Sequence, residues 1–379
     1  MKKLLLILVL FALFLNVHIH VFAVENPLDV PNNRFGIHIL FTDELQKSAK
    51  LINSNGGDWG YVTIPIQSGD RNLLKWQKFM DESRNLHVVP IIRLASEGDY
   101  FNTKVWRKPN TFDIVDFANF LNSLDWPTKN RYVVVFNEVN RADEWGGNVS
   151  PNEYADLLNF AIQTFKARSD DFFIISAGLD NASANTNFSL DEYTFLQQMY
   201  ASFPEVLSEV DGMASHSYPN PAFSQPPSLK TAHSITSFLY EQSYIKNLTG
   251  KSLPIFITET GWDKNKVSEQ IIANYFTQSF TDIWTENVVA ITPFLLSASA
   301  GPFEQFSFLN RDNSPSQMYA AVEQFPKTKG NPVLAQNVLG EAINPTKIPL
   351  KQFKAVLNQN ITVQISESIK TLIRWFIKR

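Results

Sequence analysis

The chain has 379 residues, of which 44% are hydrophobic and 18% charged, and its formal net charge is −4. This composition indicates a folded globular protein and excludes a disordered or fibrous chain. The mildly acidic balance, without a basic run interleaved with aromatic residues in the body of the sequence, argues against nucleic-acid binding. Cysteine is absent, which excludes disulfides, thiolate metal sites and thiol nucleophiles.

Residues 1–23 predict a signal peptide for export. Lys2 and Lys3 precede an apolar run that is short for a membrane span, and the sequence VFA offers a small-residue cleavage site after Ala23. An uncleaved anchor that reaches Val24 is the alternative. In both cases we expect the folded part of the protein to be extracellular or associated with the cell surface.

Short apolar runs alternate with helical patterns between residues 33 and 327. Several runs are apolar at consecutive positions, as expected of parallel strands that are covered on both faces. The runs span residues 34–40, 59–66, 87–94, 131–138, 171–178, 210–217, 253–260 and 287–296.

The segments between the runs predict helices. In the segment 150–167, Ser150 is a helix N-cap and Glu153 stands where a capping box needs it. Residues 110–124 and 267–284 have a similar apolar spacing. Eight strand–helix units in about 290 residues predict an α/β protein built as one (β/α)8 barrel, and a doubly wound open sheet is the alternative.

Residues 328–379 are expected to form a C-terminal extension without a further strand–helix unit. Its last part predicts an amphipathic helix with basic residues opposite an apolar face. The apolar face holds Ile365, Ile369, Leu372, Ile373 and Phe376, and the basic face holds Lys370, Arg374 and Lys378. Packing on the barrel and docking to a membrane or wall polymer both stay open, and the N-terminal segment offers a second route to a membrane.

Two of the apolar runs end in a glutamate. Glu138 ends the fourth run and Glu259 lies at the end of the seventh, and sites in a (β/α)8 barrel form at the C-terminal ends of the strands. Both side chains can therefore face one cleft. Two such carboxylates are the minimum for cleaving a glycosidic bond, because one protonates the leaving oxygen and the other attacks the anomeric carbon or activates water. We expect about 5 Å between their oxygens if configuration is retained.

Other residues near the strand ends have predicted supporting roles. Tyr218 can donate a hydrogen bond to an ionised Glu259, and Arg93 can pair with Glu259 and lower its pKa. Asn137 can bind the sugar 2-hydroxyl, a contact that strengthens in the transition state.

Two tryptophans follow the paired acids along the chain. Trp145 and Trp262 are candidates to stack on pyranose faces, although large aromatic residues more often belong to the core. Glu144 and Glu304 are loop acids that we expect to be solvated or to line a subsite. The histidines away from the strand ends lack partners at metal-ligand spacing, so we predict neither a metal nor a cofactor.

The segments FNE, HSY and TETGW, at the ends of the fourth, sixth and seventh runs, resemble a clan of retaining glycoside hydrolases. This clan carries Asn-Glu on strand 4 and Glu on strand 7 of the barrel and includes cellulases, mannanases and β-xylosidases. The resemblance covers residues 33–325 as a strand plan. It implies that Glu138 is the acid/base and Glu259 the nucleophile, and it matches the clan's strand-six His and Tyr to His216 and Tyr218.

The sequence departs from that clan at two places. Many members have a Trp at the end of strand 8 beneath the cleaved sugar, where this chain offers Phe294 or Phe303. The clan's histidine near strand three or four has no match unless His38 on the first run serves. We predict a monomeric retaining β-glycosidase that acts on a polysaccharide or oligosaccharide. A non-catalytic carbohydrate-binding barrel and a transglycosylase are the alternatives.

Overall fold

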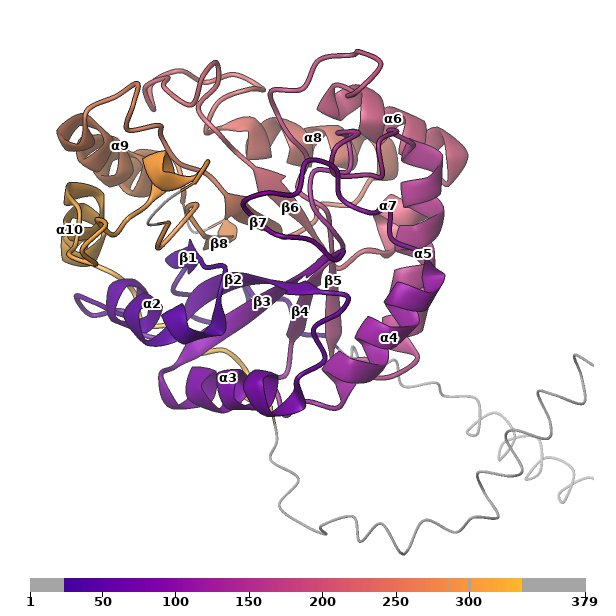
Figure 1. Cartoon of the computed structure of the whole chain (residues 1–379), viewed down its shortest axis with the longest axis horizontal. Coiled ribbons are helices and arrows are strands. Elements are labelled where there is room, and N and C mark those ends of the chain that lie inside the picture. Colours follow the sequence, from indigo (N-terminus) through magenta and orange to yellow (C-terminus); the bar gives the residue numbers. More distant parts are fainter. Residues whose placement is uncertain (1–23, 286, 299–300, 336–379) are drawn as a thin grey trace, which may run out of the picture. The chain divides into compact units, whose positions relative to one another are not determined.

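The computed structural model describes residues 24–285, 287–298 and 301–335. Eight parallel strands lie side by side in chain order, and helices surround them (Figure 1). The strands are β1 (Gly36–His38), β2 (Gly60–Gln67), β3 (Val88–Ala95), β4 (Arg131–Val134), β5 (Phe172–Ser176), β6 (Gly212–His216), β7 (Ile255–Glu259) and β8 (Val288–Ile291). The ring closes where the amide of His38 donates to the carbonyl oxygen of Pro293 at 3.0 Å. The predicted (β/α)8 barrel is therefore confirmed, since an open doubly wound sheet would not follow chain order from edge to edge.

Most of the helices connect successive strands and pack on the outside of the ring (Figure 1). They are α2 (Leu45–Ile52), α3 (Leu73–Asn85), α4 (Thr111–Asn122), α5 (Pro151–Lys166), α6 (Glu192–Ser202), α7 (Val206–Glu209), α8 (Ser237–Thr249), α9 (Glu269–Asp282) and α10 (Gln317–Gln324), with single 3₁₀ turns at Thr42–Glu44 and Glu304–Phe306. Helix α5 begins as predicted, because the Ser150 hydroxyl accepts from the amide of Glu153 at 3.4 Å. The carboxylate of Glu153 pairs with Lys108 instead of completing a capping box.

The interior of the barrel changes character along its axis. Its lower part is filled by side chains such as Tyr61, Tyr132 and Phe256, which form one buried apolar cluster. Side chains of a strand alternate between its two faces, so Arg93 of β3 follows Val89 and Ile91 into the ring. Apolar packing thus supports the polar groups that gather at the C-terminal ends of the strands.

Both ends of the described chain lie against the other end of the barrel. The amide of Glu25 donates to the Asn130 side chain at 2.9 Å, and Leu334 forms an isolated bridge with Thr128. Described residues on both sides of the predicted limits of 33–327 therefore contact the barrel. The predicted export segment and the predicted basic helix lie outside the described residues. Within the described part of the chain, no helix has the length and apolar character needed to span a membrane.

Candidate active site

Glu138 lies beyond the end of β4, not within it. The strand ends at Val134, four residues earlier than the predicted run, because Phe136 and Glu138 adopt positive φ angles of 70° and 39°. Such angles are uncommon for residues other than glycine and concentrate at functional sites. The amide of Glu138 donates to the carbonyl oxygen of Gly178 at 2.9 Å, which anchors this turn to the segment that follows β5. The side chain of Glu138 is 12% exposed.

Glu259 is the last residue of β7, as predicted. Its register partner on the neighbouring strand is His216, the last residue of β6, next to a β-bulge. The side chain of Glu259 is 9% exposed. The strand thus holds this carboxylate slightly more deeply than the turn holds Glu138.

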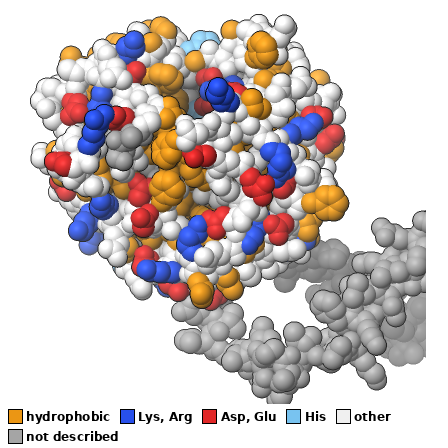
Figure 2. Space-filling model, in the orientation of Figure 1, with side chains coloured by type: hydrophobic (Ala, Val, Ile, Leu, Met, Phe, Trp, Pro, Cys, Tyr) orange, Lys and Arg blue, Asp and Glu red, His pale blue; other side chains and the backbone are white. Residues whose placement is uncertain are grey.

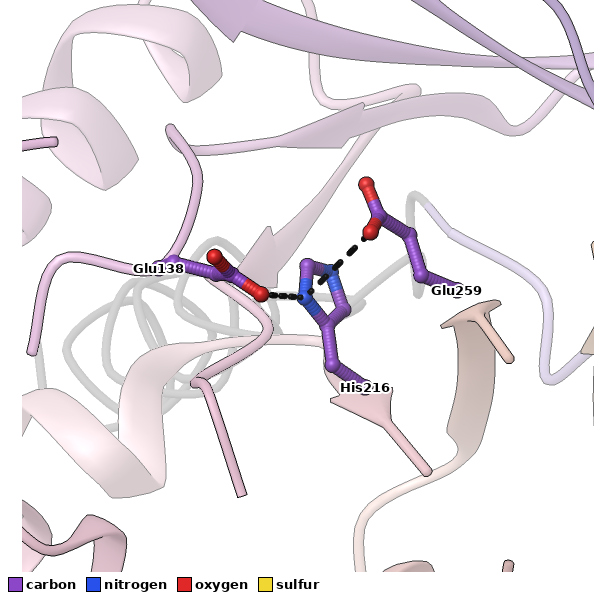
Figure 3. A group of neighbouring side chains, drawn as sticks. All are labelled: Glu138, His216 and Glu259. Carbon is purple, nitrogen blue, oxygen red and sulfur yellow. Dashed lines mark hydrogen bonds and ion pairs between the residues drawn. The ribbon is translucent and has the colours of Figure 1, made fainter. Parts of the chain in front are cut away.

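His216 lies between the two carboxylates (Figure 3). Its Nδ1 is 3.0 Å from Glu138 Oε1 and 3.8 Å from Glu259 Oε2. One ligand atom from each of the three residues can be chosen so that all lie within 4.8 Å of one another. The two carboxylates therefore meet at one end of the ring, close to the separation of about 5 Å that a covalent double displacement requires.

The surroundings of Glu259 stabilise its ionised form. Arg93 Nη1 donates to Glu259 Oε1, and the Tyr218 hydroxyl donates to Oε2 at 3.0 Å. Burial alone would raise the pKa of Glu259, but the positive charges of His216 and Arg93 outweigh it and hold this pKa well below its usual range. Arg93 Nη1 also donates to Asn137 Oδ1 at 2.7 Å, so one guanidinium positions two of the predicted site residues.

The two predicted site histidines lie behind the cleft and do not line it. Burial alone would lower the pKa of His216, but the adjacent Glu259 and Glu138 raise it, which favours an imidazolium between the two acids. His38 is fully buried, 3.7 Å from Glu259, and burial together with the charge of Arg93 lowers its pKa to about 3. His38 is therefore neutral at ordinary pH. His216 forms a hydrogen bond with Glu138 and His38 lies 3.7 Å from Glu259, so both histidines contact the carboxylates, and a role for them in binding the sugar stays a prediction.

Arg141 pairs with Glu138 and was missed by the sequence analysis. Its Nη1 donates to Glu138 Oε2 at 3.0 Å, its Nη2 lies 2.6 Å from Asp143, and Asp180 lies 3.8 Å away. Burial alone would lower the pKa of Arg141, but these carboxylates raise it. The spacing of three residues between Glu138 and Arg141 was the available signal, since residues that close in a turn can meet.

Glu144 is a third carboxyl group of the cleft. Burial, together with the negative charge of Glu138, raises its pKa to about 8. It is therefore protonated at neutral pH and can donate a hydrogen bond. The expectation that Glu144 lines a subsite fits its position, whereas the expectation of a solvated acid does not.

The paired acids open into a cleft with a volume of ≈ 560 Å³. Several of the predicted catalytic and sugar-binding residues line it. These are Glu138, Glu259, Asn137, Arg93, Tyr218 and Phe294. On the face shown in Figure 2, hydrophobic side chains gather in a stripe near the middle, with acidic and basic side chains beside it.

Aromatic side chains from three loops form much of the cleft wall. Tyr100 and Trp106 come from the loop after β3, with ring centroids 5.9 Å apart. Phe294 and Phe303 come from the segment after β8 and meet edge to face at 5.2 Å. Phe223 follows β6 and also lines the cleft. The rule that sites form after strand ends could have found Tyr100 and Trp106, because both lie in the loop that follows the third apolar run.

The predicted sugar-stacking roles of Trp145 and Trp262 are wrong in this structure. Each side chain is only 1% exposed and belongs to the apolar layer between strands and helices. Trp145 packs edge to face on Tyr154 of α5, and Trp262 packs in the same way on Phe276 of α9. The chain after each glutamate folds back toward the helices, so these rings support the barrel wall.

Glu138, His216 and Glu259 also have the spacing of a possible metal-ligand set. Their surroundings do not suit a cation, because the Arg93 guanidinium contacts Glu259 and the Arg141 guanidinium contacts Glu138. His216 Nδ1 already forms a hydrogen bond with Glu138. The side chains that could bind a metal thus already form ion pairs within the protein.

The barrel fold is shared with known glycoside hydrolases. No protein-family model matches the sequence, and no curated protein matches it. Among solved structures, a monomeric β-xylosidase from Caulobacter crescentus is similar with a TM-score of 0.58 and 14% identity, over 78% of this chain and 68% of that one. A family 39 glycoside hydrolase from Bacteroides cellulosilyticus is similar with a TM-score of 0.54 and 14% identity, over 79% of this chain and 64% of that one. A glucosidase from Croceicoccus marinus gives 0.57 and 8%, over 79% and 69%. At these identities the likeness establishes the fold.

Proposed function

We propose that this protein is a retaining β-glycosidase in which Glu259 is the nucleophile and Glu138 the acid/base. The observation that carries the proposal is the pair of glutamates within 4.8 Å at the C-terminal ends of the strands. Their different surroundings give them different roles. Glu259 is held ionised by Arg93, His216 and Tyr218, whereas Glu138 lies in a turn at the cleft surface.

The first step follows from this arrangement. A carboxylate oxygen of Glu259 forms a bond to the anomeric carbon while the bond from that carbon to the leaving oxygen breaks. Glu138 gives its proton to the leaving oxygen. This step requires the protonated form of Glu138.

In the second step water replaces Glu259 on the anomeric carbon. Glu138 takes a proton from the attacking water, so it must now be ionised. The Glu259 charge has been lost in the covalent intermediate, while the Arg141 guanidinium stays 3.0 Å from the Glu138 carboxylate.

The expected substrate is a carbohydrate with a β-glycosidic bond. The structures that share this fold include proteins named β-xylosidase and glucosidase, and the cleft combines aromatic walls with a few polar groups, as ligand sites commonly do. Tyr218 and Asn137 face the cleft beside Glu259, where they would contact the sugar ring. Release from the cell through residues 1–23 and a monomeric state remain predictions.

Hydrolysis of nitrophenyl β-glycosides tests the proposal. We expect the wild type to hydrolyse at least one of the xyloside, glucoside, mannoside and galactoside with retention, and Glu259→Ala to lose about 10⁴-fold or more in kcat. Azide should restore Glu259→Ala and yield a glycosyl azide of inverted configuration, because azide occupies the space of the nucleophile. With Glu138→Ala, azide should yield the retained product.

Glu205→Gln is the matched control, since Glu205 is an exposed glutamate outside the cleft. It should leave the rate unchanged. Binding of oligosaccharides without turnover would favour a non-catalytic barrel, and transfer to added sugars in preference to water would indicate a transglycosylase. Full activity of Glu259→Ala would reject the assignment.

A further inference from the structure

We infer that the cleft is the middle of an open groove that takes internal segments of a linear polysaccharide, so that the enzyme cuts within chains. The inference rests on the proposed glycosidase function and adds where along a glycan it acts. Its basis is that the cleft adjoins a further hollow at each of two ends.

The hollow beside Glu138 extends the cleft in one direction. It has a volume of ≈ 590 Å³ and shares Arg141, Asp143 and Asp180 with the cleft. Since Glu138 protonates the leaving oxygen, this is the side on which the leaving part of the substrate would lie. Phe188 lines the outer part of this hollow and is 74% exposed.

A second hollow extends the cleft beyond Phe101, the residue that both share. It has a volume of ≈ 520 Å³ and is lined by Phe41, which is 48% exposed. Phe41 and Tyr100, a cleft residue, meet edge to face with centroids 6.2 Å apart. Aromatic side chains therefore continue from the cleft into this hollow.

The two exposed phenylalanines are held in place by their backbones. The carbonyl oxygen of Phe188 accepts from the amide of Ala142 at 2.7 Å, and the amide of Phe41 donates to the Glu44 carboxylate at 2.9 Å. Contiguous exposed apolar side chains mark a binding surface, and Phe188 shares its hollow with the exposed Val105. Sugar rings present apolar C–H faces, so an aromatic ring at each outer hollow suits a chain with sugars on both sides of the cleaved bond.

Chain-length dependence tests this inference. We would measure kcat/KM on β-1,4-xylo-, β-1,4-gluco- and β-1,3-gluco-oligosaccharides of two to six sugars, together with the nitrophenyl glycosides. For the preferred series, kcat/KM should rise at least tenfold from two to six sugars, and the first cuts should fall at internal bonds. Phe188→Ala and Phe41→Ala should each lower kcat/KM on the six-sugar chain about tenfold and leave the nitrophenyl glycoside rate unchanged.

Phe112→Ala is the matched control, because Phe112 is 83% exposed and lines none of the three hollows. It should behave as wild type on every substrate. Release of only terminal sugars, or equal kcat/KM for two and six sugars, would overturn the inference. The proposed glycosidase function would still hold in that case if the nitrophenyl glycosides are hydrolysed. If nothing is hydrolysed, the proposed function fails. Calorimetric binding of the same oligosaccharides then tests the groove separately, and the groove inference is rejected if six sugars bind no more tightly than two.

Discussion

Two pairs of carboxyl groups lie close to β6, and they differ in what surrounds them. In the cleft, Glu138 and Glu259 face guanidinium groups and an imidazole. Outside the ring, Glu192 of α6 and Glu241 of α8 are 2% and 3% exposed and have neutral donors, among them the Ser215 hydroxyl at 2.8 Å from Glu241. Burial is strong at both places, so the difference lies in the cations.

The pKa values show the consequence. Burial raises the pKa of Glu192, and the neighbouring Glu241 raises it further. Burial also raises the pKa of Glu241, and its hydrogen-bond donors do not offset this. At Glu259 the nearby positive charges reverse the effect of burial. Burial thus raises the pKa of both glutamates of the outer pair, whereas the nearby cations lower the pKa of Glu259, and of the two pairs only the one in contact with these cations lines the cleft.

The largest expected effect follows from removing the cation that contacts Glu259. Arg93→Met keeps an unbranched stem but removes the charge and the hydrogen bonds to Glu259 and Asn137. We expect kcat/KM on the preferred nitrophenyl glycoside to fall about 100- to 1,000-fold, because the buried Glu259 carboxylate loses the guanidinium that contacts it. Arg311→Met is the control, since Arg311 pairs with Glu304 at the surface, and it should stay within about twofold. An active Arg93→Met enzyme would show that the contrast between the two pairs does not depend on this cation.

A smaller effect is expected at the imidazole between the acids. His216→Asn removes a positive charge that lowers the pKa of Glu259. That pKa should rise, so the nucleophile becomes protonated at a higher pH and the acid limb of kcat/KM against pH moves upward by about one unit. His233→Asn is the control, because His233 lies at an exposed position outside the cleft. A loss of activity that is equal at every pH would mean that His216 acts through packing alone.

The sequence predicted the barrel because buried parallel strands are continuous apolar runs, and it predicted both glutamates because polar residues stand out where such runs end. It did not predict where β4 ends, since the positive φ of Phe136 and Glu138 depends on hydrogen bonds to the strand-five side. The wrong prediction for Trp145 has the same cause, because the sequence pattern does not show that the loop of Trp145 turns back into the core.

The cleft wall was harder to predict than the acids. Trp106 lies in the loop after β3, where its amide donates to the carbonyl oxygen of Asp143 at 2.7 Å. Such contacts join loops that follow different strands, so the local sequence pattern does not predict them. The raised pKa of Glu144 likewise arises from burial and from Glu138, which only the folded chain brings about.

The smallest expected effect concerns the stability of the neutral pair. Because the pKa values of Glu192 and Glu241 are raised, the folded protein keeps protons that the unfolded chain releases above about pH 4.5. The contribution of these protons to the free energy of unfolding is complete below that pH, and it is lost as the pH rises through the pKa values of the two glutamates in the folded protein. Glu241→Gln should flatten the fall in unfolding free energy with pH by up to about 1.4 kcal/mol per pH unit, the slope for one proton, as measured by urea unfolding between pH 5 and 9. Glu205→Gln, at an exposed position, should keep the wild-type slope. If Glu241→Gln kept the wild-type dependence of unfolding free energy on pH, Glu192 and Glu241 would be ionised in the folded protein. The lack of cations would then not explain how this pair differs from the pair in the cleft.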